Sequence, residues 1–391
     1  MNAPIGMDQF QRHTVATDQN ALHGIDGLRF PLLGLFGEVG SLLSALKKKQ
    51  RDQASYLGYE DSVMEEFGDV LWYFSNVAAR AGLNLGVLAQ KMSRNLDDWE
   101  ETMAQACGTF RDIQPLSSTI KPYFSSVFEQ RLIELAGKTG RLLDDVASNR
   151  IEGNGDVLRA HLVEILRAVV AAADEASVDL NEVAQRNMRK TLSRWPRADQ
   201  RIPPPLFDLD DDIEEQLPRR IEMNVAERGP ERRKYVRLRC NGINIGDRLT
   251  DNRAEEDDYR FHDVFHLAYA AILGWSPVTR ALFKVKRKSK PEVDETQDGA
   301  RAILVEEGIS TWIFSHATKL KYFDCINSLD YSMLKTIEAQ VKGYEVESRP
   351  LWLWEKAVLD GYAVFRCLRS ERRGLVIADL NERSIVFTPL P

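Results

Sequence analysis

An internal repeat constrains the fold of this chain more than any other feature of its sequence. Residues 32–43 (LLGLFGEVGSLL) and residues 132–143 (LIELAGKTGRLL) agree at six of twelve positions at an offset of 100. A second pair of blocks, 81–90 and 176–185, shares Ala, Leu, Ala and Gln at an offset of 95. Apolar residues recur at helical spacing within each copy, so each copy is expected to be a bundle of three or four helices.

The chain beyond the repeat has a different texture. Three consecutive prolines and an acidic run (RIPPPLFDLDDDIEE) are typical of a linker. Farther on, residues 234–249 and 374–387 predict two β-hairpins with helices between them. We therefore expect a mainly α chain, in which tandem four-helix-type bundles precede an α+β domain. The expected boundaries are 1–105 for the first copy, 106–198 for the second, 199–216 for the linker and 217–391 for the α+β domain.

Charge and composition indicate which classes of binding partner to expect. The formal net charge of the 391 residues is -7, so no protein-wide positive field exists and nucleic acid is not an expected partner. The longest aliphatic stretch, 168–173, is far shorter than the roughly 20 residues that cross a bilayer. The N-terminus lacks the features of a signal peptide, and the four cysteines are widely spaced. These features predict a cytoplasmic protein with free thiols and no membrane partner, either a monomer or a homo-oligomer.

Three acids in the first copy form a candidate metal site. Glu38 lies in one predicted helix, and Glu66 and Asp69 lie three residues apart in the next, so the latter two share a helical face. Carboxylate oxygens at this density suit Mg²⁺ or Mn²⁺. Acids at helical spacing also occur on ordinary solvated faces. Glu66 and Asp69, however, alternate with apolar Phe67 and Val70, and acids at the edge of an apolar stripe need a partner.

The first copy resembles the MazG-like family of all-α nucleoside triphosphate pyrophosphohydrolases. The resemblance covers about residues 7–99 and is carried by MDQFQRHTVATD, FPLLGLFGEVGSLLSALKK and EEFGDVLWYFSNVAARAGLNLGVLAQ. The metal motif of this family is ExxE followed by ExxD. The resemblance implies that Glu38, Glu66 and Asp69 are Mg²⁺ ligands and catalytic residues. It also implies hydrolysis of an NTP or dNTP to the monophosphate and pyrophosphate.

The sequence departs from the family pattern at one acid. Ser41 stands where the ExxE motif has its second glutamate, and a hydroxyl is a weak, neutral ligand. One metal position is therefore expected to be weakened, which puts turnover in question. Glu65 is a further candidate ligand, although it points about 100° away from Glu66 on a helix.

The second copy lacks the acid pattern, so it is expected to bind no metal. The positions that align with Glu38, Ser41, Glu66 and Asp69 hold Lys138, Arg141, His161 and Glu164.

The resemblance also implies a later helix whose Asn and Lys contact the nucleotide. Asn187 and Lys190 of the second copy match these positions, and Arg194 is predicted to bind nucleotide beside them. The first copy has Met92 and Asn95 instead. The second copy has lost the acids, and the first copy has lost the Asn and Lys. This complementary pattern predicts one composite site, with acids from the first copy and nucleotide contacts from the second. The alternative is that the second copy is only a packing scaffold.

Two histidines form a candidate second metal site in the last region. His262 and His266 are one helical turn apart, and Asp263 lies between them. Glu306 and Glu307 of a later helix complete a predicted His and carboxylate site. The alternative interpretation is structural, with the histidines hydrogen-bonded or packed and the glutamates solvated. The region resembles the C-terminal extension of some MazG-like proteins, and that resemblance implies no activity.

The sequence thus supports three hypotheses for function. The first is Mg²⁺-dependent pyrophosphate release from a nucleoside triphosphate. The second is a nucleotide-binding sensor or scaffold with weak or no turnover. In the third, the chemistry lies in the C-terminal domain.

Overall fold

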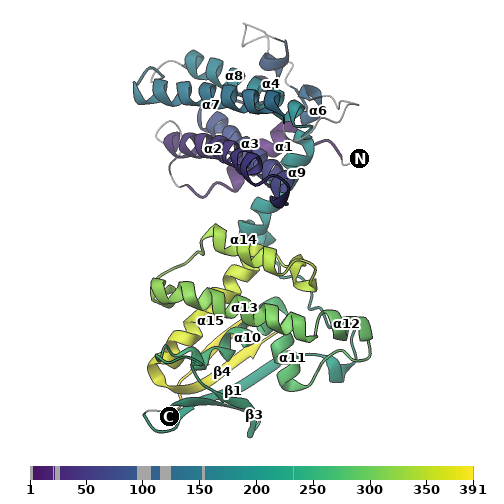
Figure 1. Ribbon diagram of the computed structural model, residues 1–391, viewed down its shortest axis with the longest axis vertical. Coiled ribbons are helices and arrows are strands. Elements are labelled where there is room, and N and C mark those ends of the chain that lie inside the picture. The colour runs from purple at the N-terminus through teal and green to yellow at the C-terminus, as the bar shows by residue number, and fades with distance from the viewer. Residues whose placement is uncertain are drawn as a thin grey trace. The chain divides into compact units, whose positions relative to one another are not determined.

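The protein consists of two compact units, Met1–Arg197 and Ala198–Pro391 (Figure 1). This computed structural model describes residues 3–20, 22, 27–94, 107–114, 125–151, 155–231 and 233–390. The first unit is helical, and the second combines helices with an antiparallel sheet. The mainly α architecture with an α+β C-terminal region, expected from the sequence, is confirmed.

The first unit contains two similar sets of helices. Local signals set several of their ends: Ser125 accepts a hydrogen bond from the backbone N–H of Phe128 at the start of α7, and Asp179 caps α9 in the same way. The helices are α1 (Met7–Ala16), α2 (Arg29–Asp52), α3 (Tyr59–Arg80), α4 (Leu85–Arg94), α6 (Phe110–Ile113), α7 (Ser126–Ala147), α8 (Gly155–Glu175) and α9 (Leu180–Arg194), with a short 3₁₀ turn at Gln53–Ser55.

The two copies exchange their last helices. Helix α2 packs along α3 and α7 along α8, but α9 packs on α3 and α4 on α8. The apolar stripes therefore merge into one hydrophobic core, in which the rings of Phe67 and Phe128 lie 6.5 Å apart between centroids. The two copies form one unit, whereas the sequence predicted two successive bundles with a boundary near residue 105.

One helix among the described residues is long and apolar enough to cross a bilayer by composition alone. It spans Arg29–Ser55, with a mean hydropathy of 1.3 in its most apolar window. The buried residues of this helix, such as Leu35 and Leu42, belong to the shared core, and the helix also carries Glu38. One face of the helix therefore packs into the core, as in an amphipathic helix of a globular unit.

A five-stranded antiparallel sheet organises the second unit, in the order β3-β2-β1-β4-β5. Alternate side chains face the helices: Met223 of β1 pairs with Cys240 of β2 and Val376 of β4, and all three are buried. The two predicted hairpins are β2–β3 and β4–β5, and β1 joins them as the central strand. The strands are β1 (Arg220–Arg228), β2 (Tyr235–Cys240), β3 (Ile243–Leu249), β4 (Arg373–Asp379) and β5 (Ser384–Thr388).

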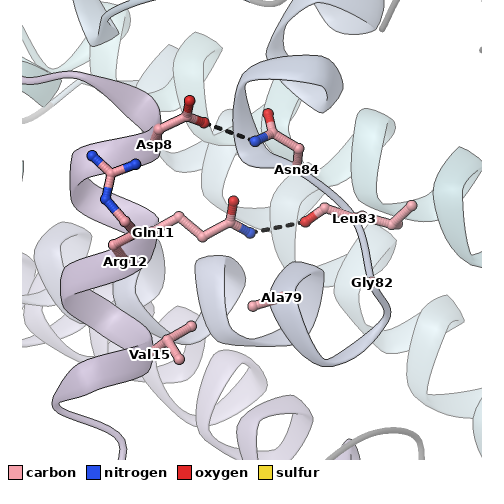
Figure 2. A pocket seen from close by; sticks show the side chains of 8 residues that line it. All are labelled: Asp8, Gln11, Arg12, Val15, Ala79, Gly82, Leu83 and Asn84. Carbon is pink, nitrogen blue, oxygen red and sulfur yellow. Dashed lines mark hydrogen bonds between the residues drawn. The ribbon is translucent and has the colours of Figure 1, made fainter.

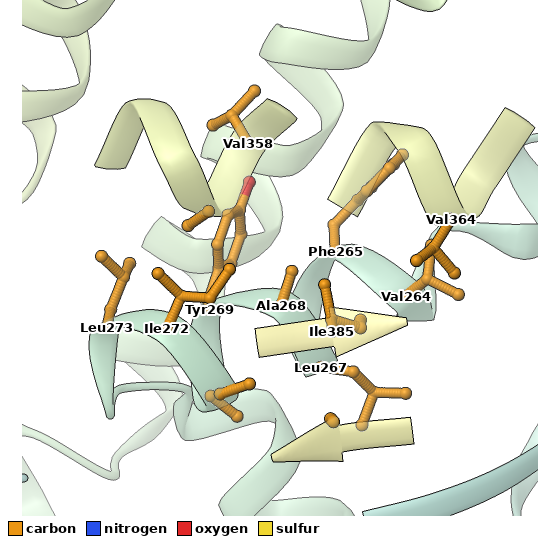
Figure 3. Packing of buried hydrophobic residues seen from close by; sticks show 14 of the residues in the cluster. Val264, Phe265, Leu267, Ala268, Tyr269, Ile272, Leu273, Val358, Val364 and Ile385 are labelled. Atoms are coloured by element: carbon orange, nitrogen blue, oxygen red, sulfur yellow. The ribbon is translucent and has the colours of Figure 1, made fainter. Parts of the chain in front are cut away.

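Helices α10 and α15 pack against the sheet and against each other (Figure 3). Phe265 of α10 stacks on Tyr362 of α15 with ring centroids 4.4 Å apart, and Gly361 lets α15 approach closely, since a Cβ there would lie 3.1 Å from that of Ala268. Helix α10 continues into a π-helical turn, Tyr269–Leu273. The helices are α10 (Asp263–Ala268), α11 (Pro277–Phe283), α12 (Pro291–Thr296), α13 (Ala300–Ala317), α14 (Tyr331–Gln340) and α15 (Leu351–Glu371), with 3₁₀ turns at Ala198–Gln200, Ile213–Glu215, Tyr259–Phe261, Thr318–Phe323 and Glu345–Ser348.

The segment expected to be a linker, 199–216, is instead packed into the second unit. Asp208 is buried and accepts hydrogen bonds from Arg219 at 2.7 Å and Arg280 at 2.8 Å. The guanidinium of Arg349 donates to the Pro205 carbonyl at 2.6 Å. The prolines and acids that predicted a free linker are held by arginines from distant parts of the unit.

Candidate functional site

Helices α2 and α3 bring the three predicted acids together. Glu38, Glu66 and Asp69 each offer a carboxylate oxygen, and these oxygens all lie within 4.8 Å of one another. Glu66 and Asp69 share one face of α3 because they are three residues apart, and this face lies toward Glu38 of α2. All three side chains are partly buried, so water screens their mutual repulsion poorly.

Burial, and then the crowding of negative charge, raises the pKa values of two of these acids. Burial, a hydrogen bond with Glu38 and the neighbouring carboxylates raise the pKa of Glu66 to about 8. Burial raises the pKa of Asp69 to about 6, although Lys190 opposes this shift. Without a bound cation, the cluster therefore holds protons near neutral pH, and a divalent ion would replace them.

Helix α9 of the second copy supplies the complementary groups. The side-chain amide of Asn187 donates to Asp69 Oδ1 at 3.0 Å, and Lys190 Nζ donates to Asp69 Oδ2 at 2.6 Å and to Glu65 Oε1 at 2.9 Å. A glycine permits this approach, since a Cβ on Gly68 would lie only 3.1 Å from Asn187 Cβ. Acids of the first copy and polar residues of the second thus meet in one place.

The other predicted residues lie at the edges of this cluster or beyond it. Glu65 contacts Lys190, as above, and Ser41 lies half-buried one turn after Glu38 on α2. The guanidinium of Arg194 lies 4.4 Å above the ring of Trp195. Met92 is buried in the core, and Asn95 lies outside the described residues.

The equivalent place in the second copy holds ion pairs. Lys138 Nζ lies 2.6 Å from Glu164, and these residues align with Glu38 and Asp69. His161, which aligns with Glu66, contacts Asp145 at 2.6 Å. A lysine has replaced one acid of the cluster and neutralises another, so no divalent ion is needed there to balance charge.

An aromatic group beside the acids was not singled out from the sequence. The ring of Tyr73 covers Gly34, where a Cβ would overlap the ring at 2.1 Å, and lies 6.3 Å from the half-exposed ring of Phe30. Burial and then the charges of Glu38 and Asp69 raise the pKa of Tyr73. Helical spacing could have placed Tyr73 beside the acids. Tyr73 follows Asp69 by one helical turn, and Gly34, which the ring covers, precedes Glu38 by one turn.

The predicted histidine cluster of the second unit also assembles, with different roles for its acids. The rings of His262 and His266 meet edge to face with centroids 5.6 Å apart, and Glu307 Oε2 lies 3.5 Å from His266 Nε2. Glu306, expected to be a ligand, is fully buried behind His266 and accepts a hydrogen bond from His266 Nδ1 at 2.8 Å. Asp263 Oδ1 lies 3.3 Å from His262 Nε2 instead.

A separate hollow of about 500 Å³ opens between α1 and the α3–α4 turn (Figure 2). Asp8 and Asn84 are hydrogen-bonded across it at 2.7 Å, and Gln11 donates to the Leu83 carbonyl at 2.8 Å. None of the clustered acids lines this hollow. Three of its polar side chains, those of Asp8, Gln11 and Asn84, are thus already hydrogen-bonded.

Comparison with known proteins finds one relative that matches a short part of the chain and one family model that matches a longer part of it. Over 69 residues, or 17% of the chain, it is 33% identical to the "Gene 37 protein" of Mycobacterium phage L5. This match covers 60% of the length of the phage protein, less than two thirds of it. A search of solved structures found no match. Residues 202–391, nearly half of the chain, match the family model of the MazG C-terminal domain.

Proposed function

We propose that the first unit is a Mg²⁺-dependent nucleoside triphosphate pyrophosphohydrolase whose site is shared by the two helical copies. The observation that carries this proposal is the meeting of Asn187 and Lys190 with Asp69, beside Glu38 and Glu66. The MazG C-terminal domain match over the second half of the chain agrees with a function related to this family. Free nucleoside triphosphates of the cytoplasm are the proposed substrates.

The donor set fits a divalent cation. The carboxylates of Glu38, Glu66 and Asp69 gather at one point, and Lys190 contacts Asp69 and the neighbouring Glu65. Burial and the neighbouring carboxylates raise the pKa of Glu66 to about 8, and a bound cation would offset the charge of these acids. Glu38, Glu66 and Asp69 would hold the ion, and oxygen ligands of this kind select Mg²⁺ or Mn²⁺.

Bound there, the ion would neutralise phosphate charge and provide a reactive water for attack on the α-phosphorus. The residues of the chain have their own tasks. Lys190 is placed to exchange part of its contact with Asp69 for a phosphate oxygen, and Asn187 keeps Asp69 oriented through its amide.

The rival function is a nucleotide-binding sensor or scaffold that turns over slowly. Ser41 favours it, because a hydroxyl takes the place of an acid that the resemblance implies. Both functions need the same nucleotide contacts. They differ in whether pyrophosphate leaves.

The test is pyrophosphate release from a panel of NTPs and dNTPs with Mg²⁺ or Mn²⁺. We expect release from the full chain and a loss of at least about 100-fold in Asp69→Asn, since a metal ligand loses its charge. Asp61→Asn is the matched control, because Asp61 is an exposed acid in the first turn of the same helix. Nucleotide binding without release from any member of the panel would favour the sensor, and unchanged rates in Asp69→Asn would refute the proposed site.

A further inference from the structure

The two histidines of α10 are oriented in the way that protein metal sites orient imidazole ligands. His262 Nδ1 lies 2.8 Å from the Tyr259 carbonyl, and His266 Nδ1 lies 2.8 Å from Glu306 Oε1. A carbonyl and a carboxylate only accept, so each Nδ1 carries the hydrogen and donates it. The Nε2 of each ring therefore points away from that partner and has no hydrogen of its own in the neutral ring. Carboxylate and carbonyl partners hold metal-binding histidines in the same way.

The side chains of His262, Asp263 and His266 converge, and Glu307, which is not a member of this three-residue cluster, approaches His266 from another helix. His262, Asp263 and His266 offer ligand atoms that all lie within 4.8 Å of one another. Asp263 Oδ1 is 3.3 Å from His262 Nε2, and Glu307 Oε2 is 3.5 Å from His266 Nε2. Ligands at about 2.0–2.1 Å in a tetrahedral arrangement are separated by roughly 3.4 Å, so these pairs have the spacing of ligands around one ion.

A buried polar atom points into this cluster. The side chain of His266 is 2% exposed, and its Nε2 makes no hydrogen bond of good geometry among the described residues, with the Glu307 carboxylate 3.5 Å away as its weak partner. A buried polar atom paired so weakly needs an explanation, and a bound ion is one that would supply the missing interaction. The side chain of Glu307 is 38% exposed, so an ion can reach the cluster from the solvent side.

The groups behind the cluster are rigidly held. Glu306 is fully buried and accepts hydrogen bonds from Ser276 Oγ at 2.7 Å and from the Val278 backbone N–H at 2.9 Å. The ring of Tyr259 stacks on His262 at 4.3 Å and nearly parallel. Both imidazoles are thus fixed before any ligand binds, which lowers the entropic cost of binding.

From this geometry we propose that His262, Asp263, His266 and Glu307 bind one divalent transition-metal ion in the second unit. Two imidazoles and carboxylates suit Zn²⁺, Mn²⁺, Fe²⁺ or Ni²⁺ better than Mg²⁺. Glu306 is a positioning residue that orients His266. Four side chains leave room for a water or substrate in the shell of an ion that accepts five or six ligands.

The site can be tested with Co²⁺ as the probe. Full-length protein without a polyhistidine tag is treated with chelator, and Co²⁺ is titrated while its visible absorption is followed. The Asp69→Asn variant serves as the background, so that ions at the first unit do not contribute. We expect one equivalent per chain with a spectrum typical of nitrogen and oxygen ligands, and competition by Zn²⁺.

Variants separate binding from folding. Glu307→Gln changes a partly exposed side chain and should weaken Co²⁺ affinity at least about 10-fold, while Glu306→Gln should weaken it about 10- to 100-fold by releasing His266. The control is His316→Ala, which removes an exposed histidine on the same helix as Glu307. A folded wild-type chain that binds no Co²⁺ or Zn²⁺ at micromolar concentrations would overturn the proposal, and so would unchanged affinity in both glutamate variants. His266 would then be a structural imidazolium between Glu306 and Glu307.

Discussion

Lys190 Nζ lies 2.6 Å from Oδ2 of Asp69, a residue 121 positions earlier in the chain and in the other copy of the repeat. The same ammonium group contacts Glu65 at 2.9 Å. Lys190 is therefore the cation that compensates the acid cluster before any metal binds. It links the two copies through charge as well as through packing.

Replacement of Lys190 by methionine should weaken nucleotide binding and strengthen metal binding. A lost charge-assisted contact to phosphate costs about 1.5–3 kcal/mol, which corresponds to roughly 10- to 100-fold in nucleotide affinity. Mg²⁺ affinity without nucleotide should rise a few-fold, on the order expected when a competing cation leaves a partly buried site. Calorimetric titration measures both quantities. Arg186→Gln on the same helix is the control, because Arg186 is exposed and pairs with Glu182.

Two separate and noninteracting copies would make Lys190→Met silent in both titrations. A loss of metal affinity would instead show that Lys190 holds Asp69 in its binding orientation.

The stability of the metal-free protein should fall as the pH rises from about 5 to 8. The pKa of Glu66 is about 8 in the folded chain against its ordinary value of 4.5, and the pKa of Asp69 is about 6 against its ordinary value of 3.8. The folded state therefore binds more protons than the unfolded state in this range, and the free energy of unfolding decreases with pH. Urea denaturation at several pH values measures this slope, which Glu66→Gln should reduce.

Metal binding should release protons over the same range. Ligation requires Glu66 and Asp69 to be ionised, so Mg²⁺ affinity should rise with pH up to about 8. Titration of Mg²⁺ in buffers of different ionisation enthalpy counts the released protons. An affinity independent of pH between 6 and 8 would contradict the assignment of Glu66 as a ligand.

Helical spacing predicted which residues of the candidate site share a face: Glu66 and Asp69 on α3, and Asn187 and Lys190 on α9. It could not place Glu38, which lies on another helix, relative to them. The complementary loss of acids and polar residues between the copies then indicated which residues meet. No spacing rule indicates which helices pack together, so the exchange of α4 and α9 between the copies was not predicted.

In the second unit, the errors have a common cause, which is contact between distant residues. The acidic segment was expected to be a free linker, but Arg280 neutralises Asp208 from 72 positions away. Of the adjacent acids Glu306 and Glu307, helical spacing could not tell which one lies behind His266 and which one beside it. The central strand β1 lies outside the two predicted hairpins. Its sequence does carry a strand pattern, because apolar Ile221, Met223 and Val225 alternate with polar residues and are buried.

Restoration of the missing acid should strengthen the metal site. Ser41 lies one turn after Glu38 on α2, half-buried, and a glutamate there would place a further carboxylate on the same helical face. Ser41→Glu should raise Mg²⁺ affinity and keep or raise the rate of pyrophosphate release, by up to about 10-fold. Ser44→Glu, three residues farther along α2, is the control. Lower turnover in Ser41→Glu, with the fold intact, would show that the hydroxyl has a role an acid cannot fill.

The exchange of helices predicts that neither copy folds alone. A fragment of residues 1–114 lacks α9, which covers α3, and α8, which packs against α4. Residues of α3 such as Phe67, which are fully buried in the shared core, would be exposed, and each large apolar side chain contributes about 1.5–3 kcal/mol when buried.

We expect residues 1–114 and residues 125–197 to show no cooperative thermal unfolding separately and to show it when they are mixed. The mixture should also recover nucleotide binding, because Lys190 then reaches Asp69 again. If the two copies were independent bundles, residues 1–114 alone would unfold cooperatively. Addition of residues 125–197 would then change neither the melting temperature of the 1–114 fragment nor its affinity for nucleotide.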